Sequence, residues 1–166
     1  MTETDFILRE TKVANRYTLH LLEKIPFDLW EITPAGLDTN VSWQVGHLIL
    51  GICYNNILVV NGAISEALKA LPMKAYFEVF GIGSNPKDYS GQFPPEQLLN
   101  DLKTMQQAAL NVVQSLTEEE LSQPLAPTKF PHPVAKLKTE AVNHSYHHTQ
   151  WHNGQIAMLK RVLGVK

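Results

Sequence analysis

Residues 143–152 have the sequence Asn-His-Ser-Tyr-His-His-Thr-Gln-Trp-His and carry four of the seven histidines in the chain. They lie within a longer segment, about 134–163, whose apolar spacing predicts a helix. His144, His148 and His152 recur every four residues and therefore share one face of that helix. Two imidazoles one helical turn apart can bind one metal ion, so the stretch predicts a long helix with a metal site on it. The spacing alone does not decide whether the pair is 144/148 or 148/152.

Three further segments have the pattern of long helices. They are predicted at about 5–25, 42–62 and 95–116. Thr117 and Glu120 then match a capping box, which predicts a short extra helix before the last long one. No strand pattern of comparable strength is present. The sequence is therefore predicted to form a single all-α domain over residues 1–166, organised as a four-helix bundle.

The connection between the second and third long helices is unusually long. It spans about 72–94 and contains prolines, glycines and four aromatic residues, namely Tyr76, Phe77, Phe80 and Tyr89. A connection of this length is usually functional or disordered. The aromatic residues favour a loop that packs over part of the bundle, and we expect it to cover a substrate.

Composition excludes several classes of protein. The net charge is −2 and no cluster of Lys and Arg is present, so the surface favours neither nucleic acid nor an anionic membrane. Residues 1–10 are polar and acidic, and we expect no signal peptide. The apolar stretch at 48–60 is interrupted at 54–56 and is expected to be too short to span a bilayer. With one cysteine in the chain, we expect a cytoplasmic protein.

A metal site on the last helix needs a third ligand from elsewhere, because three protein ligands and one open position are typical of catalytic zinc. The best candidate is His47, early in the second predicted helix and beside apolar residues that indicate the interior. His20 is a weaker candidate, expected to be partly exposed. His132 lies between two prolines and is expected in a loop. Cys53 lies six residues past His47 and faces away from it, and we expect a buried, inert thiol.

Two stretches resemble motifs of the DinB-like superfamily of metal-binding four-helix bundles, which includes the YfiT-like proteins. They are residues 41–48 (VSWQVGHL) and 148–164 (HTQWHNGQIAMLKRVLG), the latter similar to a family ending H-x-x-x-H-x-G-Q-I … L-R-x-x-L-G. Length and helix order agree over nearly the whole chain. The resemblance implies one DinB-like domain whose metal ligands are His47, His148 and His152. It also implies a homodimer.

Other residues near these motifs are candidates for contacts around the site. Gln155 follows His152 by three residues and is expected either to hydrogen-bond a ligand ring or metal-bound water, or to serve as a helix-packing amide. His144 is expected to line the pocket or to contact a ligand. Trp43 and Trp151 flank the motifs and are expected to pack in the core or to form a pocket wall.

Two glycines lie beside the motif histidines. Gly46 precedes His47 directly, and Gly154 follows His152 by two residues. We expect both glycines to permit a close approach of helices rather than to take part in chemistry.

The resemblance covers two kinds of enzyme: metal-dependent hydrolases, and transferases or isomerases that use low-molecular-weight thiols such as bacillithiol, mycothiol or glutathione. The segment from His148 to His152 lacks the Glu that acts as base in the zinc-protease motif. Because a metal ion deprotonates a bound thiol directly, whereas a hydrolase benefits from a base, we expect transfer of a thiol to an electrophilic small molecule. A hydrolase is the alternative, and a non-catalytic metal- or small-molecule-binding module is another.

The expected cofactor is one divalent metal ion per chain, zinc or nickel. Neutral imidazole binds both ions well, and nickel exceeds most of its neighbours in affinity for such sites. The expected partners are a small-molecule substrate, with a low-molecular-weight thiol as co-substrate, and a second copy of the chain.

Overall fold

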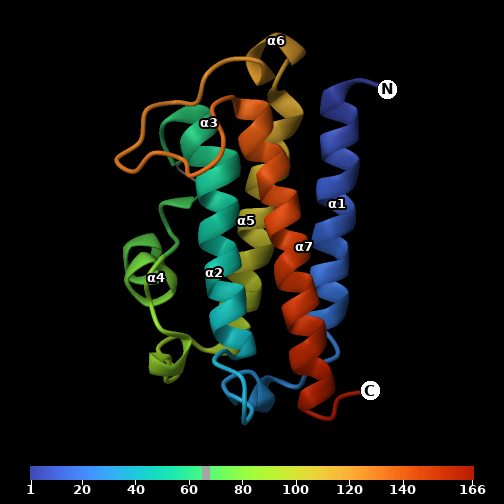
Figure 1. Ribbon diagram of the computed structural model, residues 1–166, viewed down its shortest axis with the longest axis vertical. Coiled ribbons are helices and arrows are strands. Elements are labelled where there is room, and N and C mark those ends of the chain that lie inside the picture. Colours follow the sequence, from blue (N-terminus) through green and yellow to red (C-terminus); the bar gives the residue numbers. More distant parts are fainter. Residues whose placement is uncertain (65–67) are drawn as a thin grey trace.

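Four long helical segments lie side by side in the computed structural model, which describes residues 1–64 and 68–166 (Figure 1). They are α1 (Glu3–Leu22), α2 (Val41–Cys53), α5 (Pro95–Ser115) and α7 (Lys138–Val162). The described ranges contain no strand, only one isolated β-bridge between Pro124 and Leu137. The predicted all-α bundle is therefore confirmed.

The helices form a closed square in which each contacts two neighbours. α1 contacts α7 and α5, and α2 contacts α5 and α7, so the α1–α5 side lies opposite the α2–α7 side. α1 and α7 run in one direction and α2 and α5 in the other (Figure 1). Because α2 and α5 are parallel, the chain must return along the bundle between them, and this requires the long connection.

α2 does not end at Cys53 but continues as a π-helix and a last α-helical turn. These are η2 (Tyr54–Leu58) and α3 (Val59–Asn61). The helix predicted at about 42–62 is therefore confirmed and runs through the polar residues at 54–56. The expectation that this stretch is too short to span a bilayer is wrong, because Val41–Asn61 has 21 residues and a mean hydropathy of 1.3 in its most apolar window. That window is 67% buried inside the bundle, as in the core helix of a helical bundle.

The long connection contains a helix that the sequence pattern does not predict. α4 (Met73–Phe80) packs against α2, and η4 (Pro86–Asp88) follows it. Tyr76, Phe80 and Tyr89 are buried, which explains why an aromatic-rich segment does not remain a loose loop. Phe77 is exposed on the other side of α4.

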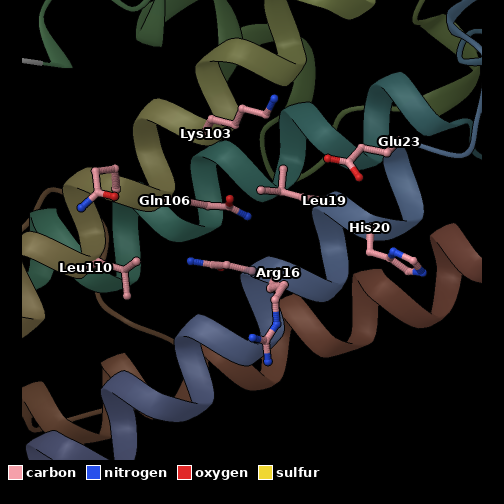
Figure 2. A pocket seen from close by; sticks show the side chains of 9 residues that line it. Arg16, Leu19, His20, Glu23, Lys103, Gln106 and Leu110 are labelled. Atoms are coloured by element: carbon pink, nitrogen blue, oxygen red, sulfur yellow. The ribbon is translucent and has the colours of Figure 1, made fainter.

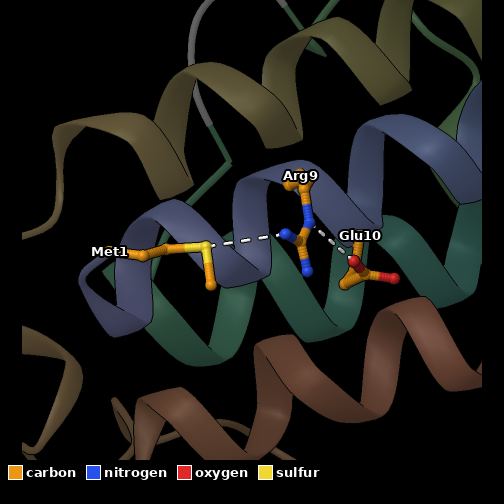
Figure 3. A network of polar contacts seen from close by, with 3 residues as sticks. All are labelled: Met1, Arg9 and Glu10. Atoms are coloured by element: carbon orange, nitrogen blue, oxygen red, sulfur yellow. Dashed lines mark hydrogen bonds and ion pairs between the residues drawn. The ribbon is translucent and has the colours of Figure 1, made fainter.

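Helix ends agree with local capping chemistry. Thr2 and Asp5 form a capping box at the start of α1. The predicted box of Thr117 and Glu120 is confirmed and opens α6 (Glu118–Leu121). Near the start of α1, Arg9 donates to Glu10 at 2.9 Å and to the Met1 sulfur at 3.6 Å (Figure 3). These contacts are exposed and contribute little to stability.

The last long helix begins later than the sequence pattern predicts. α7 starts at Lys138 rather than near Val134. The Glu140 carboxylate accepts hydrogen bonds from the backbone N–H groups of Lys136 (2.6 Å) and Leu137 (3.1 Å). A side chain that binds the N–H groups preceding its own helix fixes the helix start there.

Candidate metal centre

Three predicted ligands come together at the contact between α2 and α7. His47 projects from α2, and His148 and His152 project from α7. One ring nitrogen of each lies within 4.8 Å of the others, and the Nε2 atoms of His148 and His152 are 3.2 Å apart. Among the described residues these side chains form a group that could hold a metal ion. The pair at 148/152, rather than 144/148, thus faces His47.

Hydrogen bonds fix the tautomers of two of these rings. His47 Nδ1 lies 2.7 Å from the Phe80 carbonyl oxygen, which can only accept, so Nδ1 donates and Nε2 keeps its lone pair. His152 Nδ1 likewise donates to Gln44 Oε1. Gln44 is oriented because its Nε2 donates to Thr39 Oγ1 at 3.0 Å. Both rings therefore present Nε2 as a ligand atom, the usual arrangement when a second group orients a metal-binding histidine.

Burial lowers the pKa of each of the three rings. It is the main reason that the pKa of His148 falls to about 4, with further lowering by His47 and His144. Burial also brings the pKa of His152 to about 3, again helped by the neighbouring histidines. The pKa of His47 is lowered by burial, although the Phe80 carbonyl opposes the shift. At pH 7 all three are neutral, the form in which imidazole binds a metal ion.

Close packing holds the rings in place. Trp43 stacks on His47 with ring centroids 4.8 Å apart, and its Nε1 donates to Ser84 Oγ at 3.2 Å. The His148 ring lies directly over Gly51, where an added Cβ would meet Cε1 at 2.8 Å. Because the rings of His47 and His148 are already held in one position, they lose little conformational freedom when a ligand binds.

The other predicted residues lie at varying distances from the cluster. The half-buried His144 ring is 6.1 Å from that of His148. Trp151 is 61% exposed and meets the rings of His144 and His148 edge-on, at 5.9 and 6.3 Å. Gln155 is exposed on α7, and the amide that contacts a site histidine is that of Gln44. His20 is exposed on α1, away from the cluster.

Gly46 and Gly154 differ in how closely other side chains approach them. An added Cβ on Gly46 would lie 2.3 Å from the Phe80 ring, so this glycine does permit a close approach, of α4 to α2. Gly154 is exposed, with nothing within 4 Å of an added Cβ. The expectation of close packing at Gly154 is therefore wrong.

The groups that orient the ligands are not evident from the sequence. Gln44 lies three residues before His47, inside a motif already singled out, but its contact is with His152 on another helix. The Phe80 carbonyl has no sequence signal, because every residue has such a group. His132 also has a defined place: it accepts from the N–H of Ala135 at 2.8 Å and donates to Asn55 Oδ1 at 2.7 Å.

Cys53 is buried in the core, as expected. Its exposed fraction is 1%, and burial raises the pKa of its thiol to about 12. It takes no part in the histidine cluster.

Comparison with known proteins agrees with this architecture. No match to a curated protein is found. A solved structure of a conserved protein from Enterococcus faecalis has the same fold, with a TM-score of 0.63, 17% sequence identity and 98% coverage of each chain. The DinB superfamily model matches residues 10–156, a range that contains all three clustered histidines. This match covers most of the chain, and it shows that the chain belongs to the DinB superfamily.

Proposed function

We propose that this protein is a metal-dependent enzyme that transfers a low-molecular-weight thiol to an electrophilic small molecule. One observation carries the proposal: the ring nitrogens of His47, His148 and His152 converge within 4.8 Å from two helices. His152 is buried, whereas His47 and His148 are partly exposed. A small molecule can therefore reach the cluster from solvent.

The residues present fit a divalent ion of the zinc or nickel type. Three neutral imidazoles are ligands that both ions prefer. The lone pairs on Nε2 of His47 and His152 are directed by hydrogen bonds at Nδ1, so two rings are already oriented for the ion. When bound, such an ion lowers the pKa of a thiol or water at its open position.

The surroundings of the rings favour a thiol over water as nucleophile. The groups that contact the three rings are the Gln44 amide, the Phe80 carbonyl and aromatic rings. No carboxylate is among these contacts in the described part of the chain. A hydrolase benefits from a base that takes the proton of water, whereas a metal-binding thiol needs none.

An exposed aromatic rim beside the cluster supports an apolar electrophile as the substrate. His148 contacts His144, which meets the His132 ring edge-on at 5.3 Å. Beyond His132, Phe130 and Phe77 stack at 6.3 Å and are 54% and 56% exposed. In the proposed reaction, the substrate lies on this rim and the thiol sulfur bonds to its electrophilic carbon. The leaving group departs from that carbon with its bonding electrons, and the thiol proton passes to solvent.

The first experiment is metal content by mass spectrometry on untagged protein, for wild type, His148→Ala and His147→Ala. His147 is the matched control, because it is an exposed neighbour outside the cluster. We expect about one metal ion per chain in wild type and in His147→Ala, and loss of the ion in His148→Ala. No metal in any of them would contradict a metal enzyme.

The second experiment assigns the reaction. The metal-loaded protein is incubated with glutathione, bacillithiol or mycothiol and a panel of aromatic electrophiles, and separately with esters and amides. We expect thiol conjugates that disappear in His148→Ala. Cleavage of esters or amides without conjugation would instead establish the hydrolase, and bound metal with neither activity would favour the non-catalytic module.

The proposed thiol chemistry and the family resemblance also bear on where the enzyme acts and in what oligomeric state. We propose that it acts in the cytoplasm, where low-molecular-weight thiols are kept reduced. We also propose that it forms a homodimer, as the resemblance to the DinB-like superfamily implies. The net charge of −2 argues against nucleic acid as a partner. Size-exclusion chromatography with light scattering tests the dimer.

A further inference from the structure

A cavity of about 490 Å³ lies between α1 and α5, on the side of the bundle opposite the α2–α7 contact that holds the histidines (Figure 2). Its volume is in the range of sites for small molecules. The cavity is separate from the proposed metal centre, since none of the three clustered histidines lines it.

A buried amide without a partner lines this cavity. Gln106, on α5, is only 4% exposed, and its Nε2 has no hydrogen-bond partner among the described residues. Figure 2 shows the Gln106 amide in the space between α5 and α1, facing the helix that carries Leu19. A buried N–H donor left unpaired destabilises the folded chain. A ligand that supplies an acceptor oxygen removes this cost.

A second buried amide faces the same space from α1. Asn15 is 7% exposed and lines the cavity, and within the described ranges no hydrogen bond joins its side chain to another residue. Leu19 and Leu110 supply apolar wall between the polar groups. The cavity therefore combines polar side chains with a small apolar surface, as sites for organic molecules do.

Two positively charged side chains lie at the rim of the cavity. Arg16 on α1 and Lys103 on α5 are exposed residues that line the cavity, and in Figure 2 both side chains extend away from the Gln106 amide into the surrounding space. Neither takes part in an ion pair in the described part of the chain. Glu23, at the end of α1, is the carboxylate of the rim, so the surroundings favour one negative charge on a ligand rather than several.

We propose that this cavity binds a small organic monocarboxylate. The carboxylate oxygens accept hydrogen bonds from Gln106 Nε2 and the Asn15 amide, Arg16 and Lys103 balance the charge, and the carbon part of the ligand lies against Leu19 and Leu110. The site is independent of the proposed thiol transfer, because it uses different helices and different residues.

Nuclear magnetic resonance of the full chain tests the proposal. The side-chain NH₂ signals of ¹⁵N-labelled protein are followed during titration with acetate, butyrate and benzoate, each compared with its uncharged amide. The Gln106 signals are identified by their loss in Gln106→Leu. We expect saturable shifts of these signals with the carboxylates, and binding of the amides weaker by about tenfold or more.

Variants locate the site. Gln106→Leu removes the unpartnered donor, so it should fold at least as stably as wild type and lose carboxylate binding. Gln107→Leu is the matched control at the same cavity wall. Because the Gln107 Nε2 already donates to Asn111 at 2.9 Å, this change removes no unpartnered donor, and the variant should bind as wild type does. Lys103→Gln, at an exposed position, should weaken the carboxylates but not the amides.

Three outcomes would overturn the proposal. The absence of saturable shifts with every probe would mean that water alone occupies the cavity. Equal affinity for carboxylates and amides would remove the charge requirement. Undiminished binding by Gln106→Leu would place the probes elsewhere.

Discussion

His47 Nδ1 lies 2.7 Å from the carbonyl oxygen of Phe80, the last residue of α4. This hydrogen bond connects the long connection between α2 and α5 to a proposed metal ligand. The Phe80 ring is fully buried and lies against Gly46, one residue before His47. The position of α4 thus determines the orientation of the His47 ring, so a change in α4 packing should alter metal binding without touching a ligand.

Replacing Gly46 with alanine tests that connection. The added methyl group would lie 2.3 Å from the Phe80 ring, which also packs against Tyr76 and Tyr89, so the ring cannot move freely. We expect Gly46→Ala to lower the free energy of unfolding by about 1–3 kcal/mol, measured by urea denaturation. Metal affinity should fall as well, because the Phe80 carbonyl must shift with the ring.

Gly154→Ala is the matched control for Gly46→Ala. Gly154 is also helical, but an added methyl group there meets nothing within 4 Å. We expect this variant to raise the free energy of unfolding by roughly 0.8–1.0 kcal/mol through helix propensity. Equal effects of the two substitutions would show that contact with Phe80 is unimportant.

Gln44 should control metal affinity through His152. Gln44→Leu keeps a buried side chain of similar size but removes the acceptor for His152 Nδ1. We expect zinc affinity to fall by about 10- to 100-fold, measured by competition with a chromogenic chelator. Gln150→Leu, an exposed change on α7, serves as the control and should leave the affinity unchanged. An unaltered affinity in Gln44→Leu would remove Gln44 from the site.

Metal binding should stabilise the folded chain by mass action. With zinc at about 100 times its dissociation constant, the free energy of unfolding should rise by about 2.7 kcal/mol, and a chelator should reverse the rise. His47→Ala should fold without metal and show no such gain, as expected for a site that is catalytic rather than structural. If His47→Ala instead fails to fold, the metal has a structural role that ties α2 to α7.

His132 should make stability depend on pH. Its pKa is lowered, first by burial and then by the nearby His144, while Glu140 opposes the shift. Below about pH 6.5 the unfolded chain therefore binds more protons at His132 than the folded chain does. The contribution of His132 to the free energy of unfolding is complete above that pH and decreases as the pH falls through the pKa of His132 in the folded chain. Protonation at Nδ1 would also break the hydrogen bond from the Ala135 N–H.

The measurement for His132 is urea denaturation of metal-free wild type and His132→Gln between about pH 7.5 and about pH 5. The difference between the two proteins isolates His132 from the other histidines. We expect wild type to lose more stability than the variant on acidification. Parallel curves would show that His132 titrates alike in the folded and unfolded chains.

The helices and the spacing of His148 and His152 could be predicted because their signals are local, and the family motif at 41–48 added His47. Apolar spacing predicted four long helices, and a capping box predicted α6. The boundary near residue 134 was wrong because Glu140 binds backbone N–H groups ahead of α7. α4 was missed because its short amphipathic segment lies among prolines and glycines, where periodicity is weak.

Sequence by itself determined which side chains share a helix face, since the period of the α-helix fixes the spacing of His148 and His152 wherever that helix lies. Only the tertiary structure shows that the predicted His47 meets His148 and His152, whereas His144 and His20 stay outside the cluster, because this depends on how α2 packs against α7. The tautomers, too, depend on packing. A carbonyl or an amide orients an imidazole only when the fold brings them together, as it does here for Phe80 with His47 and Gln44 with His152.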